Sequence, residues 1–66
     1  MDRNEWRMLC DVRKGDVTFD GFEVVVAPIR YLGDCGMYAV KDPVSGVTMT
    51  DYWSWDEELY MRCRDA

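Results

Sequence analysis

Short apolar runs separated by turn-forming residues dominate the first half of the chain. Residues 17–19 and 22–27 flank Asp20-Gly21, a dipeptide favoured in two-residue hairpin turns because both residues tolerate positive φ. The second run contains three consecutive valines, which place apolar side chains on both faces, so we expect a central strand there. Pro28 has no amide hydrogen to donate, which predicts a bulge or a locally unpaired edge.

The same pattern continues through residue 50. The glycine-rich residues 33–36 are typical of a turn, and residues 37–41 form the next strand-like run. A second turn is expected at residues 42–46, where a proline presets φ. Residues 47–50 then alternate between apolar and polar side chains, which is the period of a half-buried strand. These segments predict an antiparallel sheet of three to four strands.

The N-terminal segment carries a helical pattern. Asp2 and Glu5 have the spacing of a capping box in which aspartate replaces serine or threonine. Trp6, Leu9 and Cys10 follow at helical spacing, and the segment ends at a glycine, which is a natural helix terminator. We therefore expect a short helix whose apolar stripe packs on the sheet.

The C-terminal segment begins with a stronger helix signal. Ser54 and Glu57 form a capping box, and acidic residues occupy the first turn, where the helix dipole favours negative charge. Trp55, Leu59 and Cys63 are spaced four residues apart and form a second apolar stripe. This pattern predicts a second helix that buries the stripe against the sheet.

Together these elements predict a single α+β domain over residues 1–66, in which an antiparallel sheet carries both helices on one face. A hydrophobic content of 48% is enough to build a core and argues against intrinsic disorder. The longest apolar run, Val24–Ile29, is too short to span a membrane, and no export signal follows Met1. Three cysteines do not suit a disulfide scaffold. We expect a cytoplasmic protein without a membrane partner.

The residues offer little for catalysis. Gly33-Asp34-Cys35-Gly36 resembles the nucleophile loop of chymotrypsin-fold proteases, but the chain has no histidine to act as the base. We interpret the string as a turn with an incidental cysteine. Cys10 and Cys63 are expected to be small apolar core residues on the two helix faces. The cysteines lack C-x-x-C spacing and no phosphate-binding glycine loop is present, so we expect no metal, no cofactor and no enzyme activity.

Negative charge is concentrated in the middle of the chain. The net charge is −5, yet residues 16–58 hold nine acids and two bases, a balance of −7, whereas residues 1–15 and 59–66 each stand at +1. Alternate residues of a strand lie roughly 6.6 Å apart, comparable to the phosphate spacing of a nucleic-acid strand. Such a surface would compete for a basic nucleic-acid-binding groove, and direct nucleic-acid binding is not expected. Solubility and the capping of turns also explain acids of this kind.

Tyr52 is the aromatic residue expected to anchor this acidic surface. Strand alternation directs Trp53 and Trp55 inward and leaves Tyr52 toward solvent beside the acids, where tyrosine often forms an interface hot spot. The residues expected to contact a partner are Asp16, Asp20, Glu23, Asp51, Tyr52, Asp56, Glu57 and Glu58.

In its length, its acidic middle and its outline ending in Trp53-Ser54-Trp55-Asp56-Glu57-Glu58, the chain resembles the small acidic inhibitors of phages and mobile elements, especially anti-CRISPR proteins. The likeness is one of type across the whole chain, without a shared motif. It implies a non-catalytic inhibitor of the host bacterial cytosol that blocks a basic nucleic-acid-binding surface, such as that of a Cas effector subunit, as a DNA mimic or steric block. We expect a monomer. The alternative is a structural or assembly module that self-associates through a sheet edge or aromatic patch.

Overall fold

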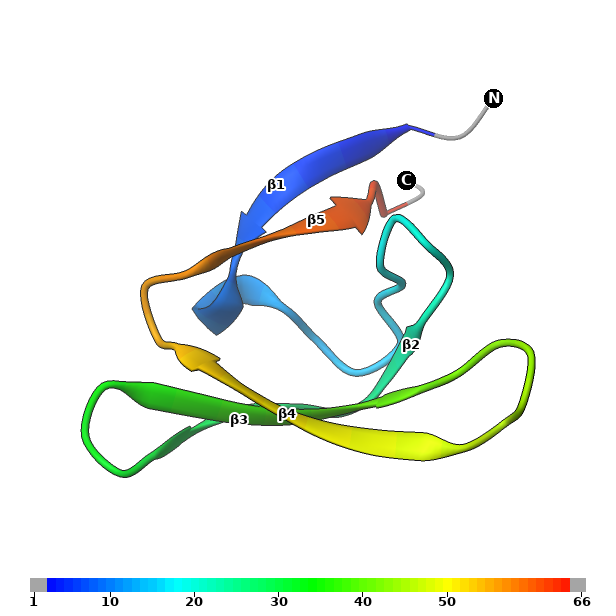
Figure 1. Cartoon of the computed structure of the whole chain (residues 1–66). Helices are drawn as coiled ribbons and strands as arrows, with labels where there is room; N and C mark the ends of the chain where they lie inside the picture. Colours follow the sequence, from blue (N-terminus) through cyan, green and yellow to red (C-terminus); the bar gives the residue numbers. More distant parts are fainter. Residues whose placement is uncertain (1–2, 65–66) are drawn as a thin grey trace.

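The computed structural model describes residues 3–64, which form five β-strands and one 3-10 turn (Figure 1). In chain order the elements are β1 (Asn4–Met8), η1 (Leu9–Asp11), β2 (Glu23–Tyr31), β3 (Cys35–Lys41), β4 (Thr48–Ser54) and β5 (Glu58–Arg62).

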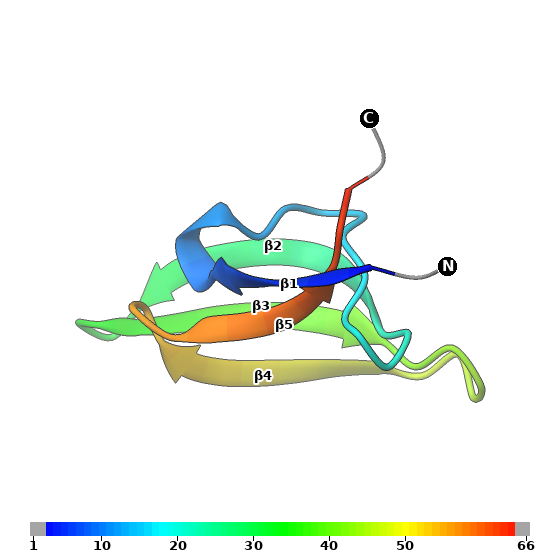
Figure 2. The ribbon, with the colours of Figure 1, turned by 90° about the horizontal axis from the view of Figure 1, so that it is seen from above.

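The strands form two antiparallel sheets. β1 pairs with β5 in a two-stranded sheet, and β2, β3 and β4 pair in that order in a three-stranded sheet. The small sheet lies across one face of the larger one (Figures 1 and 2), and the core fills the space between them. The buried core residues are Leu9, Val12, Val24, Tyr38, Val40 and Met61, with Phe22, Trp55 and Leu59 packed against them.

The expected α+β class is wrong, because residues 3–64 contain no α-helix. The N-terminal segment is extended and pairs along its whole length with β5, so that Trp6 lies opposite Tyr60 with ring centroids 5.0 Å apart. Cross-strand aromatic pairs of this kind stabilise a sheet and outweigh a weak helix preference. Of the expected stripe only Leu9 is buried, whereas Trp6 and Cys10 are exposed. The expected cap Asp2 lies outside the described residues.

The predicted C-terminal helix is also wrong, because the segment forms β5, and the spacing of its apolar residues explains the error. Residues four apart share one face of a helix, but they also share one face of a strand. The stripe of Trp55, Leu59 and Cys63 is therefore compatible with either structure. Met61 decides between them, because it is fully buried on the same face as Leu59 and Cys63. Residues two apart share a face in a strand but not in a helix. Ser54 begins a turn instead of a helix, and its carbonyl accepts a hydrogen bond from the amide of Glu57.

The valine-rich strand β2 lies at an edge of the larger sheet, and the central strand is β3, which corrects the expected order. Register shifts between Val24 and Val26 and between Val26 and Ile29 interrupt the β2–β3 pairing. The second shift spans Pro28, so the predicted bulge is confirmed. The segment before β2 covers part of its other edge, where the amide of Val24 bonds the carbonyl of Asp16.

The expected hairpin around Asp20-Gly21 forms only in part. The chain reverses there, but Val17 makes a single bridge to Glu23 and no full strand precedes β2. Gly21 has φ of 98°, whereas Asp20 keeps a negative φ, so the turn is not the expected type I′. The chain turns at 42–46 between β3 and β4, as predicted, whereas the turn predicted at 33–36 lies at 32–34, and Cys35 and Gly36 already belong to β3.

Candidate partner-binding surface

The acidic residues expected on one surface are divided among four places. Asp16 lies inside the molecule, with its side chain 8% exposed. It accepts hydrogen bonds from Arg64 at 2.7 and 3.0 Å, from Arg7 at 3.2 Å and from the amide of Arg13 at 2.9 Å. Two guanidinium groups therefore neutralise this carboxylate, and it presents no free charge to a partner.

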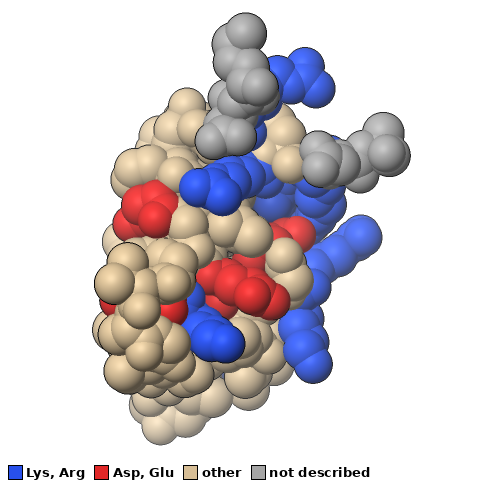
Figure 3. Space-filling view, turned by 90° about the vertical axis from the view of Figure 1, so that its right-hand side faces the viewer, with Lys and Arg blue, Asp and Glu red and all other residues tan. Residues whose placement is uncertain are grey.

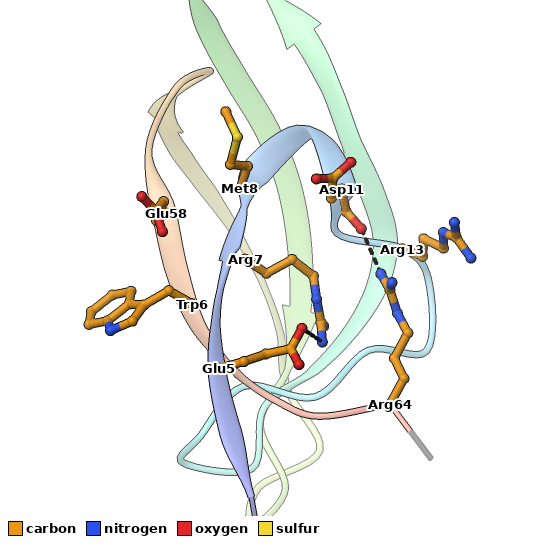
Figure 4. A pocket seen from close by; sticks show the side chains of 8 residues that line it. All are labelled: Glu5, Trp6, Arg7, Met8, Asp11, Arg13, Glu58 and Arg64. Atoms are coloured by element: carbon orange, nitrogen blue, oxygen red, sulfur yellow. Dashed lines mark hydrogen bonds and ion pairs between the residues drawn. The ribbon is translucent and has the colours of Figure 1, made fainter. Parts of the chain in front are cut away.

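The Asp16 cluster joins segments from both ends of the chain. Arg7 comes from β1 and is 4% exposed, and Arg64 follows β5. Figure 4 shows Arg7 held by Glu5, and Arg64 reaching the carbonyl of Asp11. Burial alone would raise the pKa of Asp16, but hydrogen bonds from Arg64 and the Arg13 amide, with both arginine charges, bring it below its ordinary value. The cluster therefore holds β1 and the end of the chain after β5 against the segment that carries Asp16.

Glu23 lies at one end of the larger sheet, beside a base. It is opposite Lys41 in the β2–β3 ladder, where opposite charges attract across the strands. The turn carrying Asp56 follows β4 at the other end of the sheet, because Ser54 is opposite Cys35. A seven-residue strand separates the two ends by about 20 Å at 3.3 Å per residue. Glu23 and the Asp56 turn therefore belong to different surfaces.

Asp20 and Asp51 share a groove. They line a hollow of about 280 Å³ whose other lining residues include Phe22, Tyr38 and Met49. Burial, together with the nearby charge of Asp51, raises the pKa of Tyr38 to about 12, so its hydroxyl stays protonated at neutral pH. The groove therefore combines an apolar lining with two carboxylates.

Tyr52 is exposed, as its position in the alternation predicts, but it does not lie among the acids. It pairs with Met37, on the face of the larger sheet opposite to Asp51 and the core. Its ring centroid is 5.6 Å from that of Tyr31 on β2. Tyr52 thus belongs to an apolar outer face, which also exposes Val26 and Ile29.

Among residues 3–64, Asp56, Glu57 and Glu58 form the one compact group of acids, which we call the acidic corner. They occupy the tight turn between β4 and β5 and the first position of β5. The carbonyl of Glu57 accepts a hydrogen bond from the amide of Leu9 at 2.9 Å, which fixes the corner against the end of β1. With Trp6 the three acids line an open hollow of about 420 Å³.

Three aromatic rings contact one another in a tilted arrangement on the outside of the smaller sheet, and we call them the aromatic ladder. Tyr60 is the middle ring, with centroids 5.0 Å from Trp6 and 5.6 Å from Phe19. Trp6 is 64% exposed, and Phe19 is also exposed. Figure 4 shows Trp6 projecting from β1 on the same side as Glu58 and away from Arg64. Sequence reasoning missed this feature because it treated Trp6 as a buried helix residue.

The acidic corner keeps its charge available. Within the part of the chain that the structure describes, no lysine or arginine nitrogen lies within 4.0 Å of its carboxylates, whereas Asp34 is paired with Arg30 at 3.8 Å. Figure 3 views the molecule from the right-hand side of Figure 1. On this face most cationic side chains lie along the right, acidic groups lie over the middle and left, and some cationic groups lie beside the acids. The two signs of charge are therefore only partly separated.

The three thiols are free, and the expected core positions of Cys10 and Cys63 are wrong. Cys10 is exposed, and Cys35 and Cys63 are half-buried. Hydrogen bonding to Glu5, followed by burial, raises the pKa of the Cys63 thiol and so lowers its reactivity. Across residues 3–64 the acidic and thiol side chains do not gather in a group that would hold a metal ion. No helix in the same span is long and apolar enough to cross a membrane.

Comparison of the chain with protein-family models, with curated proteins and with solved structures found no match.

Proposed function

We propose that this protein is a non-catalytic binding module that docks a basic protein on the aromatic ladder and the acidic corner. The observation that supports the proposal is a largely exposed tryptophan that contacts a second ring and is bordered by three carboxylates, none of which forms an ion pair in residues 3–64. Tryptophan and tyrosine contribute most of the binding energy in many protein interfaces.

The chemistry of this surface suits lysine and arginine side chains. A guanidinium or ammonium group is attracted to the face of an indole ring, and Trp6 offers such a face to solvent. The carboxylates of Asp56, Glu57 and Glu58 line the same hollow and would pair with the charge. Trp6 and Tyr60 lie on two paired strands, so these two rings would lose little conformational freedom on binding.

A partner that uses its basic surface to hold nucleic acid would lose that function while bound. This is the inhibitor role that the resemblance to anti-CRISPR proteins implies, and it is part of the proposal. Steric block suits the arrangement better than mimicry of a phosphate row, because Asp16 is neutralised and Asp20, Glu23 and Asp51 lie away from the acidic corner. The compact corner would still accelerate association with a basic surface.

Reversing the charge of the acidic corner tests the proposal. The triple variant D56K/E57K/E58K should bind the partner at least tenfold more weakly, because three attractions become repulsions. Candidate partners would come from a bacterial lysate passed over the immobilised protein, and affinities would then be measured by titration at low and high salt. Wild-type binding should weaken as salt rises, and the variant should be less salt-sensitive.

Two variants make the result specific. Trp6→Ala removes the exposed ring without changing charge and should also weaken binding about tenfold or more, as expected of a hot spot. The control E23K/D34K reverses two exposed acids that lie outside the acidic corner and should bind with less than a threefold change. If the corner variant and W6A both keep wild-type affinity for a partner that the control also binds, this surface is not the docking site.

The outer face of the larger sheet supports a second candidate function, self-association. Val26, Ile29, Tyr31 and Tyr52 are exposed there and form an apolar area without a partner in residues 3–64. Apolar surfaces of this kind often mark interfaces. Sedimentation over a range of concentrations distinguishes the candidates, since association through this face should be almost insensitive to salt and should be reduced by I29T/Y52S.

A further inference from the structure

The two edges of the larger sheet differ in how accessible they are. β2 is broken by two register shifts and contains Pro28, and hydrogen bonds with the segment before it occupy part of its outer edge. β4 instead keeps an unbroken seven-residue register with β3. Figure 2 shows β4 at the margin of the sheet, and no other described segment pairs with its outer edge.

β4 has one of the usual features that protect an edge strand from pairing, the inward-facing charge of Asp51, which opposes a neutral added strand and favours one that supplies a basic side chain. Natural edges also carry lysine, proline or bulges that block the addition of another strand. β4 contains none of these, all seven of its residues are exposed, and its one charged residue is Asp51. The free amides and carbonyls of such an edge are a template for an extended segment of another chain.

The groove beside this edge indicates the chemistry of that segment. Asp51 faces the core side of the sheet, opposite Tyr38, and lines the groove together with Asp20 from the turn before β2. The hydroxyl of Thr18 donates to one carboxylate oxygen of Asp20, and neither acid has an ion pair in residues 3–64. Tyr38 and Val40, both buried, supply apolar contact below the two charges.

We propose that β4 binds an extended segment of a partner protein by strand addition, with one arginine or lysine side chain of that segment seated in the groove between Asp20 and Asp51. Side chains of an added strand alternate between the two faces of the sheet, so every second residue of the segment would lie on the groove side. The long aliphatic part of the basic side chain packs against the apolar lining, while its charge reaches the carboxylates.

This site is separate from the acidic corner. Asp51 lies in the middle of β4, and Asp20 lies in the turn before β2, whose residue Gly21 is close to Pro43 at the far end of the sheet from Asp56. Binding at the β4 groove therefore does not rest on the docking surface proposed above. One partner with a basic surface and an extended basic segment would engage both sites, and each site would act without the other.

A seven-residue peptide tests the proposal directly. The probe is an acetylated and amidated peptide of alternating threonine and valine with a central arginine, added to the isotope-labelled full chain while amide NMR shifts are recorded. We expect the largest shifts in residues 48–54 and in Asp20. The matched control peptide carries citrulline, which keeps the shape of arginine without its charge, and it should bind about tenfold more weakly because the charge-assisted hydrogen bonds are lost.

Protein variants complete the test. Asp51→Asn and Asp20→Asn should each weaken the arginine peptide by about fivefold to tenfold and leave the citrulline peptide unchanged. D56K/E57K/E58K should bind both peptides as the wild type does, which separates this proposal from the docking surface. Equal affinity for both peptides, shifts centred on Trp6, or a dimer of the free protein that pairs through β4 would each overturn the proposal.

Discussion

Asp16→Asn should destabilise the fold by about 3 kcal/mol, because the buried guanidinium of Arg7 loses its buried carboxylate partner and keeps only Glu5, whose side chain is 49% exposed. A domain of this size has a total stability of roughly 3–10 kcal/mol, so much of the protein would unfold near physiological temperature. The urea midpoint, followed by tryptophan fluorescence, measures the loss. Asp34→Asn is the control. The side chain of Asp34 is 92% exposed, so this substitution should change the free energy of unfolding by less than about 0.5 kcal/mol.

The stabilising effect of Asp16 should also depend on pH. Its pKa lies below the ordinary value in the folded protein, so its contribution is fully present above about pH 4 and is lost as pH falls through the folded pKa. The stability difference between wild type and Asp16→Asn should therefore be constant from neutral pH to about pH 5 and should shrink in more acidic solution. A difference that stayed constant down to pH 2 would contradict this account of the cluster.

Gly36→Ala should be the second strongly destabilising substitution, by about 2–3 kcal/mol. Gly36 lies in β3 on the core side, where an added Cβ would overlap the Cδ2 atom of Leu9 and lie 2.9 Å from the ring of Trp55. Both neighbours are packed between the sheets, so neither can move aside without disturbing the core. Equilibrium unfolding in urea measures the effect, with circular dichroism as the check that the variant keeps its strands.

A double-mutant cycle tests the cause of that loss. Leu9→Val removes the colliding Cδ2 atom, so Gly36→Ala should destabilise the Leu9→Val protein by at least about 1 kcal/mol less than it destabilises the wild type. Purely additive effects would mean that glycine is required at this position for another reason. The sequence alone does not indicate this contact, because the string 33–36 resembles a turn, whereas Gly36 is part of a strand.

The strands in the middle of the chain could be predicted because their signals are local. Period-two alternation and the turn residues around them locate the segments that become β2, β3 and β4, and Pro28 marks a real bulge. The partners of the two chain ends could not be predicted in this way. Trp6 pairs with Tyr60, more than fifty residues away, and no local pattern reports such a contact.

The candidate binding surface could also be predicted only in part from the sequence. The excess of acids between residues 16 and 58 is a property of the sequence, and it alone motivates a basic partner. Tertiary structure decided which acids are available, since it buries Asp16 between two arginines and directs Asp51 into a groove. It also brought Trp6 beside Asp56, Glu57 and Glu58, which no spacing along the chain suggests.

By itself, the sequence determined that the middle of the chain is β-structure and that the protein carries excess negative charge. Only the tertiary structure decided that both ends are strands, because residues four apart lie on one face of a helix and of a strand alike. Whether such a segment forms a helix or a strand depends on whether another strand is available to pair with it, and here β1 and β5 pair with each other. Burial then determined which charges are neutralised and which remain available to another protein.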